Sequence, residues 1–170
     1  MANNHTAGIA ARTFAPSELC QRMLAKTSKG ACGPCILYLE DGTIFYGRAC
    51  GAEGTATGEV CFNTSLEGYF EVMTYPSYAG QIVTMTYPQI GNYGVNEDDV
   101  QASEIALRGL VVRDMCTHPS NWRSAESLPE FLRKRGVVAI EGIDTRALVR
   151  HLREAGAMRA VLSTEDLNEV

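Results

Sequence analysis

The hydrophobic pattern changes along the chain, and the order of that change restricts the folds open to it. Short β-rich runs, interrupted by glycine or proline, occupy residues 36–113, whereas apolar residues at helical spacing dominate after residue 127. No internal repeat or low-complexity segment interrupts this order. Strands that come before helices, with returns between strands that are not neighbours in sequence, predict an α+β or mixed α/β layer fold.

The predicted strands begin with a hairpin. Residues 36–48 hold two β-rich runs on either side of Asp41-Gly42, a dipeptide that readily adopts the positive φ values of a tight turn. Further strands are predicted at 59–63, 81–86 and 109–113, and 81–86 alternates apolar with polar residues. We expect residues 91–96, rich in glycine and asparagine, to form a loop.

Short helices are predicted in the first part of the chain. One falls at 17–26, a second within 65–78, and a third begins at the acidic residues 97–99. The second must end at Pro76, because proline lacks the amide hydrogen that continues a helix.

The last third carries stronger helix signals. Ser127 and Glu130 have the spacing of a capping box, in which the side chain of each residue hydrogen-bonds to the backbone amide of the other. A strand is predicted at 137–140. Asp144 is placed to cap the final helix, and Gly156 is placed to end it.

Composition indicates an ordinary soluble protein and excludes some partners. Apolar residues make up 45% and charged residues 21% of the chain, whose net charge of -5 argues against a nucleic-acid-binding surface. Polar residues interrupt every apolar stretch before about 18 positions, so we expect no membrane span. The six cysteines lack the density of a secreted disulfide scaffold, which favours a cytoplasmic location.

The N-terminal segment leaves two interpretations open. Residues 1–34 are rich in alanine, serine and threonine and contain more basic than acidic residues. We expect a poorly ordered extension. The alternative is a transit peptide, which would make the protein organellar.

The cysteines offer two candidate reactive sites. Cys32 and Cys35 have the spacing of a redox-active pair, but they precede a predicted strand, whereas such a motif should open a helix. Cys116 and His118 could be a nucleophile and its base, but side chains two positions apart need a special turn to meet. We therefore expect neither pair to be catalytic, and we expect no metal site, because no second cysteine or histidine pair stands at ligand spacing.

The sequence also lacks the common nucleotide-binding motifs. The sequence contains neither the P-loop pattern nor a dinucleotide-binding glycine pattern between a strand and a helix. By contrast, residues 58–96 hold a succession of loops rich in hydroxyls, amides and glycine. Such loops either supply converging hydrogen-bond groups to a ligand or partner or simply build turns.

The same loops carry a resemblance to a known family. The chain resembles the N-terminal domain of the small, glutamine amidotransferase subunit of carbamoyl-phosphate synthetase. The matching blocks, in order over about 120 residues, are 39–43 (LEDGT), 58–65 (GEVCFNTS), 76–84 (PSYAGQIVT), 86–88 (TYP), 90–96 (IGNYGVN), 109–114 (GLVVRD), 120–123 (SNWR), 142–148 (GIDTRAL) and 152–157 (LREAGA).

The resemblance implies a fold and a division of the chain. The fold would be a mixed α/β, three-layer β/β/α domain of the swivelling type over residues 35–162, with residues 163–170 starting a linker. The linker would lead to a class I glutamine amidotransferase domain that carries the family's nucleophilic cysteine in a G-x-C-x-G elbow. None of the six cysteines here has that setting, so we expect the catalytic half to lie outside this chain, through engineered or natural truncation.

The resemblance also implies roles for particular residues. Ser77 corresponds to a serine that contacts glutamine from the N-terminal domain, and its hydroxyl can both donate and accept a hydrogen bond. Tyr75 stands where the family usually has aspartate, which puts a charged interaction there in doubt. Weaker expectations for interface residues are Asn63, Ser65, Tyr69 and Asn92.

The implied reaction takes place mostly outside this chain. Glutamine would form a thioester on the missing cysteine, and the released ammonia would pass to the large subunit, which holds ATP and Mg and makes carbamoyl phosphate for pyrimidine and arginine synthesis. This chain would need no cofactor of its own. Its partners would be L-glutamine, the large subunit and the amidotransferase domain.

Overall fold

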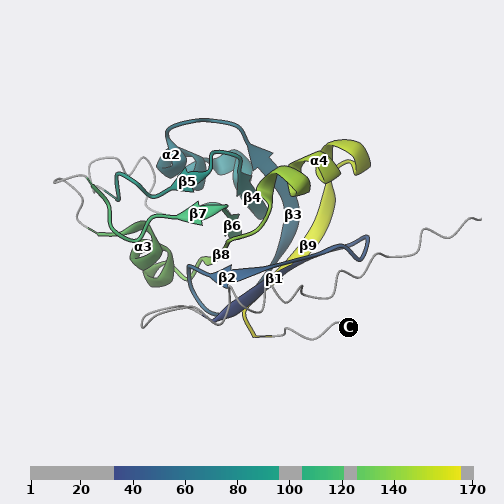
Figure 1. Ribbon diagram of the computed structural model, residues 1–170, viewed down its shortest axis with the longest axis horizontal. Helices are drawn as coiled ribbons and strands as arrows, with labels where there is room; N and C mark the ends of the chain where they lie inside the picture. Colours follow the sequence, from purple (N-terminus) through teal and green to yellow (C-terminus); the bar gives the residue numbers. More distant parts are fainter. Residues whose placement is uncertain (1–32, 96–104, 121–125, 166–170) are drawn as a thin grey trace, which may run out of the picture.

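A closed barrel of strands forms the centre of the structure, a computed structural model that describes residues 33–95, 105–120 and 126–165 (Figure 1). The strands, in the order in which they pair, are β1 (Pro34–Leu39), β2 (Ile44–Ala49), β8 (Val138–Glu141), β6 (Gly109–Val111), β4 (Gln81–Met85), β3 (Thr55–Asn63) and β9 (Met158–Ser163). Pairing of β9 with β1 closes the barrel.

The barrel mixes two kinds of strand pairing. Strands β3, β4, β6 and β8 run parallel to one another, whereas β1, β2 and β9 make antiparallel pairs. Parallel neighbours need crossover connections. Helix α2 (Tyr69–Thr74) lies in the crossover from β3 to β4, and α3 (Leu128–Lys134) lies in the crossover from β6 to β8. The predicted mixed α/β class is confirmed, and the three-layer arrangement stays a prediction.

The predicted hairpin is confirmed as β1 and β2. The Leu39 amide donates to the Thr43 carbonyl at 2.9 Å, and the Thr43 amide donates to the Asp41 carboxylate at 2.9 Å. Gly42 takes a φ of 89°, which residues with a side chain rarely adopt. The Asp-Gly turn therefore sets the register of the hairpin through local chemistry alone.

Strand β9 was missing from the sequence-based expectations. It lies between β1 and β3 in the sheet. The burial of its side chains alternates over much of its length, with Arg159 exposed and Met158 and Ala160 buried. After it, the Thr164 amide donates to the Gly54 carbonyl at 3.1 Å. The described fold thus extends beyond residue 162, and the linker starting at 163 stays a prediction.

Two hydrophobic cores lie on opposite faces of the parallel strands. The barrel core contains residues from all seven barrel strands and from helix α4 (Thr145–Ala155). The lateral core lies among α2 (Tyr69–Thr74), α3 (Leu128–Lys134), β5 (Gln89–Ile90) and β7 (Asp114–Met115). Figure 1 shows these elements on one side of β4, β6 and β8 and α4 on the other. On β4, Ile82 faces the barrel core and Val83 the lateral core, so the strand is apolar on both faces.

The helix boundaries follow the local signals. Helix α2 ends at Thr74, and Pro76 starts the single-turn helix η1 (Pro76–Tyr78). The amide and hydroxyl of Ser127 donate to the Glu130 carboxylate at 3.3 and 2.9 Å, which confirms the capping box of α3. Asp144 accepts from the Ala147 amide at 3.0 Å and caps α4.

The short helices predicted at 17–26 and 97–99 lie outside the described residues. Within the described ranges, no helix is both long enough and apolar enough to cross a membrane.

Candidate functional site

Ser77 occupies the centre of the exposed turn η1. The turn is held by its own backbone, because the amides of Tyr78 and Ala79 donate to the carbonyls of Tyr75 and Pro76, both at 3.0 Å. Ser77 is exposed, and its hydroxyl has no hydrogen-bond partner among the described residues. A hydroxyl in this setting is free to donate to and accept from an external ligand.

Asn63, the last residue of β3, joins two of the predicted site loops. Its amide group donates to the Tyr78 hydroxyl at 2.9 Å, next to Ser77, and its carbonyl oxygen accepts from the Ser65 amide at 2.7 Å. Asn63 is half-buried, whereas Ser65 is exposed. We call Asn63, Ser65 and Tyr78 the Asn63 junction. Its bonds connect the loop before α2 to the turn after it.

The segment that follows Ser77 is also tied to β3. Gln81 donates to the Glu59 carboxylate and accepts from the Cys61 thiol, both at 3.3 Å. Burial, with a smaller effect of the Glu59 charge, raises the pKa of the Cys61 thiol to about 11. Cys61 therefore holds its proton at neutral pH and serves as a hydrogen-bond donor there.

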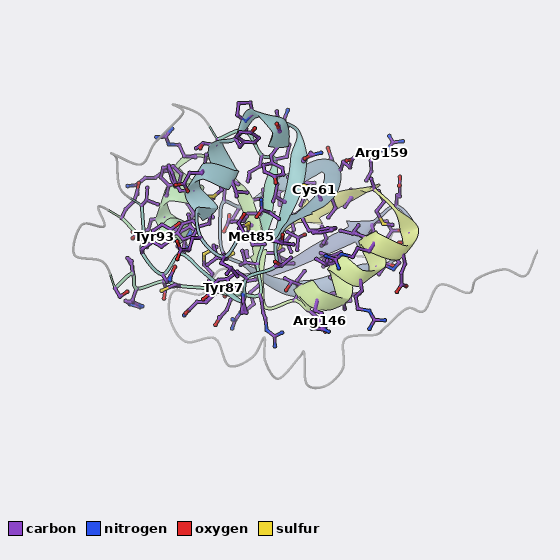
Figure 2. The ribbon with its side chains drawn as sticks, turned by 90° about the horizontal axis from the view of Figure 1, so that it is seen from above. Cys61, Met85, Tyr87, Tyr93, Arg146 and Arg159 are labelled. Atoms are coloured by element: carbon purple, nitrogen blue, oxygen red, sulfur yellow. The ribbon has the colours of Figure 1, made fainter. Side chains whose placement is uncertain are left out.

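Tyr69 lies in the lateral core, so the expectation that it serves an interface is corrected. Its side chain is only 3% exposed, its ring stacks on Tyr93 with centroids 4.1 Å apart, and its hydroxyl donates to the Gly94 carbonyl at 2.7 Å. Figure 2 shows Tyr93 at the end of the molecule opposite Arg159. The Tyr69 side chain thus fastens the 91–95 loop to α2.

Asn92 belongs to that same loop and is exposed. Its carbonyl accepts from the amide of Ser120 at 3.0 Å and from the hydroxyl of Ser120 at 3.3 Å. The loop contacts Tyr69, the first residue of α2, whereas Ser77 lies shortly after the last residue of that helix. The structure therefore brings Asn63 and Ser65 to the turn of Ser77, and it places Asn92 at the other end of the helix.

Large apolar side chains are exposed near this turn in sequence. Leu66 is 73% exposed, Tyr75 is 58% exposed, and the rings of Tyr75 and Tyr78 meet edge to face with centroids 6.3 Å apart. Tyr75 stands where the resemblance implies that the family usually has aspartate, and here it presents an aromatic surface. The sequence analysis did not select Leu66, although an apolar residue in a polar loop is a detectable signal.

The candidate redox pair is not supported at its second cysteine. Cys35 is buried in β1, and burial raises the pKa of its thiol to about 12, which leaves almost no thiolate at neutral pH. Cys32 lies outside the described residues.

Cys116 and His118 do not form a nucleophile and base. The Cys116 thiol donates to the backbone carbonyl of His118 at 3.2 Å, while the His118 ring lies 2.9 Å from the Thr117 hydroxyl. In the described part of the chain, no group of three or more histidine, cysteine or acidic side chains is arranged to hold a metal ion.

A long-range contact between two ionisable side chains was not anticipated from the sequence. His151 on α4 lies 2.6 Å from the carboxylate of Asp41 in the hairpin turn. Desolvation alone would raise the pKa of Asp41, but hydrogen bonds from Thr43 and His151 outweigh it and lower that pKa. The two residues are 110 positions apart, so local pattern analysis had no signal for the pair.

Known proteins are similar in sequence to this chain over most of its length. Residues 37–162 match the family model described as carbamoyl-phosphate synthase small chain, CPSase domain. The carbamoyl phosphate synthase small chain of Akkermansia muciniphila is 58% identical over 130 residues, which cover 76% of this chain and 35% of that protein. The small chain of Thermotoga maritima is 54% identical over 133 residues, which cover 78% and 34%. The chain thus spans about a third of the length of the curated relatives it matches.

Proposed function

The chain belongs to the family of carbamoyl-phosphate synthase small chains, and on that premise we propose that it is the N-terminal domain of a glutamine-dependent carbamoyl-phosphate synthetase small subunit. A class I amidotransferase domain outside this chain releases ammonia from glutamine. A large subunit with ATP and Mg then uses the ammonia to make carbamoyl phosphate for pyrimidine and arginine synthesis. This domain supplies interface and one part of the glutamine site, and alone it hydrolyses no glutamine.

The observation that carries the glutamine assignment is the setting of Ser77. Its hydroxyl is exposed, lacks a partner among the described residues, and sits on a turn whose backbone bonds and proline restrict its motion. A preorganised donor and acceptor loses little conformational entropy when it binds a polar ligand such as an amino acid. Ser77 therefore suits a supporting contact to glutamine whose chemistry takes place on another domain.

The proposed protein partners rest on exposed apolar groups and on the family. Leu66 and Tyr75 present apolar surface that a partner can desolvate. Asn63, Ser65 and Asn92 add polar groups for such an interface. We propose the large subunit and the amidotransferase domain as the partners, the three-layer swivelling arrangement as the fold type, and the cytoplasm as the location, with an organelle as the alternative.

A chimeric enzyme tests this function. Residues 37–162 would replace the matched segment of the Thermotoga maritima small chain, and the chimera would be assembled with the large subunit. We expect glutamine-dependent carbamoyl phosphate synthesis. Ser77→Ala should raise the KM for glutamine and leave synthesis from added ammonia unchanged, because ammonia bypasses the glutamine site.

Thr57→Ala is the matched control, because it also removes an exposed hydroxyl, in this case one on β3. It should leave both activities unchanged. An unaltered glutamine KM in Ser77→Ala would remove Ser77 from the site. Glutamine hydrolysis by the purified 170-residue chain, above the level of its own Ser77→Ala variant, would contradict the proposed inactivity of this domain.

A further inference from the structure

We propose that the hydrogen bond between Asn63 and Tyr78 positions Ser77 for glutamine, so that both are positioning residues that need not touch the substrate themselves. This inference rests on the proposed function, because it takes Ser77 as the residue that binds glutamine. It adds a reason why the end of β3 and the turn η1 must be joined.

The backbone of η1 fixes the shape of the turn but not its place on the domain. The bonds within residues 75–79 would persist if the whole turn tilted as one body. Contacts to other elements are needed to prevent such a tilt. The structure supplies them at the end of α2, where the Tyr75 amide donates to the Val72 carbonyl at 3.4 Å, at the start of β4, and at the side chain of Tyr78, whose ring also packs against the lateral core.

The start of β4 holds one side of the turn close to β3. Gln81 pairs with Glu59 in the parallel ladder, and their side chains are hydrogen-bonded at 3.3 Å. Next to them, a Cβ on Gly58 would lie 2.4 Å from the Gly80 carbonyl oxygen, so only glycine permits this close approach.

The Asn63 junction holds the other side of the turn η1. Asn63 lies four positions beyond Glu59 on β3, which corresponds to about 13 Å along a strand. The side chain of Tyr78 reaches this second point, with 2.9 Å between its hydroxyl and the Asn63 amide nitrogen. Ser77 is adjacent to Tyr78, so losing this bond removes the polar contact that limits rotation of the turn about the start of β4, while the packing of the Tyr78 ring against the lateral core remains.

The orientation of the Asn63 side chain is determined by its other partner. The backbone amide of Ser65 can only donate, so Asn63 must present its carbonyl oxygen to it, at 2.7 Å. The amide nitrogen is then left to face Tyr78. Asn63 is therefore not free to rotate, and the position of the Tyr78 hydroxyl is specified through the loop of Ser65.

The chimeric enzyme described above provides the test through the glutamine KM. Tyr78→Phe removes the hydroxyl and should raise the glutamine KM roughly three- to tenfold, the effect of one hydrogen bond, with the ammonia-dependent rate unchanged. Asn63→Leu should raise it at least as much. Asn63→Asp should retain a glutamine KM close to that of the parent, because a carboxylate can accept from both the Ser65 amide and the Tyr78 hydroxyl. Tyr87→Phe is the control, as it removes a hydroxyl from a partly exposed tyrosine outside the junction.

A double variant separates positioning from direct contact. If Tyr78 acts through Ser77, Tyr78→Phe should add nothing to the glutamine KM of Ser77→Ala. Independent, multiplying effects would overturn the inference. If Ser77→Ala raises the KM and Tyr78→Phe does not, the positioning role fails while the proposed function stands. If Ser77→Ala has no effect, the proposed role of Ser77 fails and this inference fails with it.

Discussion

Thr84 on β4 permits a prediction whose sign is unusual for a core substitution. Its side chain is 0% exposed, lies opposite Phe62 and Val111 in the sheet, and shares the face of Ile82 in the barrel core. Its hydroxyl has no hydrogen-bond partner among the described residues. Thr84→Val replaces this hydroxyl by a methyl group of similar shape, so we expect the protein to become more stable.

The magnitude follows from the cost of burying a hydroxyl without a partner. Mutational data place that cost at about 1–3 kcal/mol, and the valine avoids it without leaving a cavity. For a chain of this size, 1 kcal/mol corresponds to about 2–4 °C in Tm. Thr84→Val should therefore raise Tm by about 2–12 °C.

Thermal unfolding followed by circular dichroism measures this change, and Thr74→Val is the matched control. Thr74 is also buried, but its hydroxyl donates to the carbonyls of Phe70 and Glu71 at 3.2 and 3.3 Å. Its substitution should lower stability by about 0.5–1.5 kcal/mol. The two variants remove the same group from buried positions and should shift Tm in opposite directions.

A decrease of Tm in Thr84→Val comparable to that in Thr74→Val would refute this reasoning. The Thr84 hydroxyl would then have a hydrogen-bond partner in solution, and the barrel core would contain a polar contact at this strand. Urea unfolding at constant m-value would verify that the change concerns stability and not the unfolded state.

Substitutions at three further residues test local interactions. Tyr69→Phe leaves the buried carbonyl of Gly94 without its donor and should destabilise by about 1–3 kcal/mol in urea unfolding; a change below about 0.5 kcal/mol would contradict the role of this bond. Asp144→Ala removes the cap of α4 and should cost about 1 kcal/mol, whereas Asp144→Asn should retain most of it. The pKa of Asp41 is lowered in the folded state, so its contribution is complete above its unfolded pKa of about 4 and is lost as pH falls through the folded value. The stability difference between the parent and Asp41→Asn should therefore vanish in acid, and a difference that persists at low pH would exclude the His151 pair as its source.

Local sequence was sufficient where a few neighbouring residues control the backbone. The Asp41-Gly42 turn, the end of α2 before Pro76 and the cap at Asp144 were predicted and are confirmed. In each case the determining groups lie within four positions of the feature they control, so no distant partner is needed.

The candidate site was only partly accessible from sequence. Family resemblance selected Ser77, and the structure adds that the residue is exposed on a short turn. Asn63 was expected at an interface, but its bonds to Ser65 and Tyr78 depend on where the end of β3 meets η1. That meeting point follows from the register of β3 and β4, which sequence alone left open.

By itself, the sequence determined the turn at Asp41-Gly42, the helix ends at Pro76 and Asp144, and the resemblance to the family, because these depend on short stretches of residues. The order of strands and helices left an α+β fold open beside the mixed α/β class. Only the tertiary structure decided that β9 closes the barrel against β1, that Tyr69 is buried and that His151 meets Asp41. These features join segments far apart in the chain. Their free energy comes from burial and pairing that exist only after the whole barrel has closed.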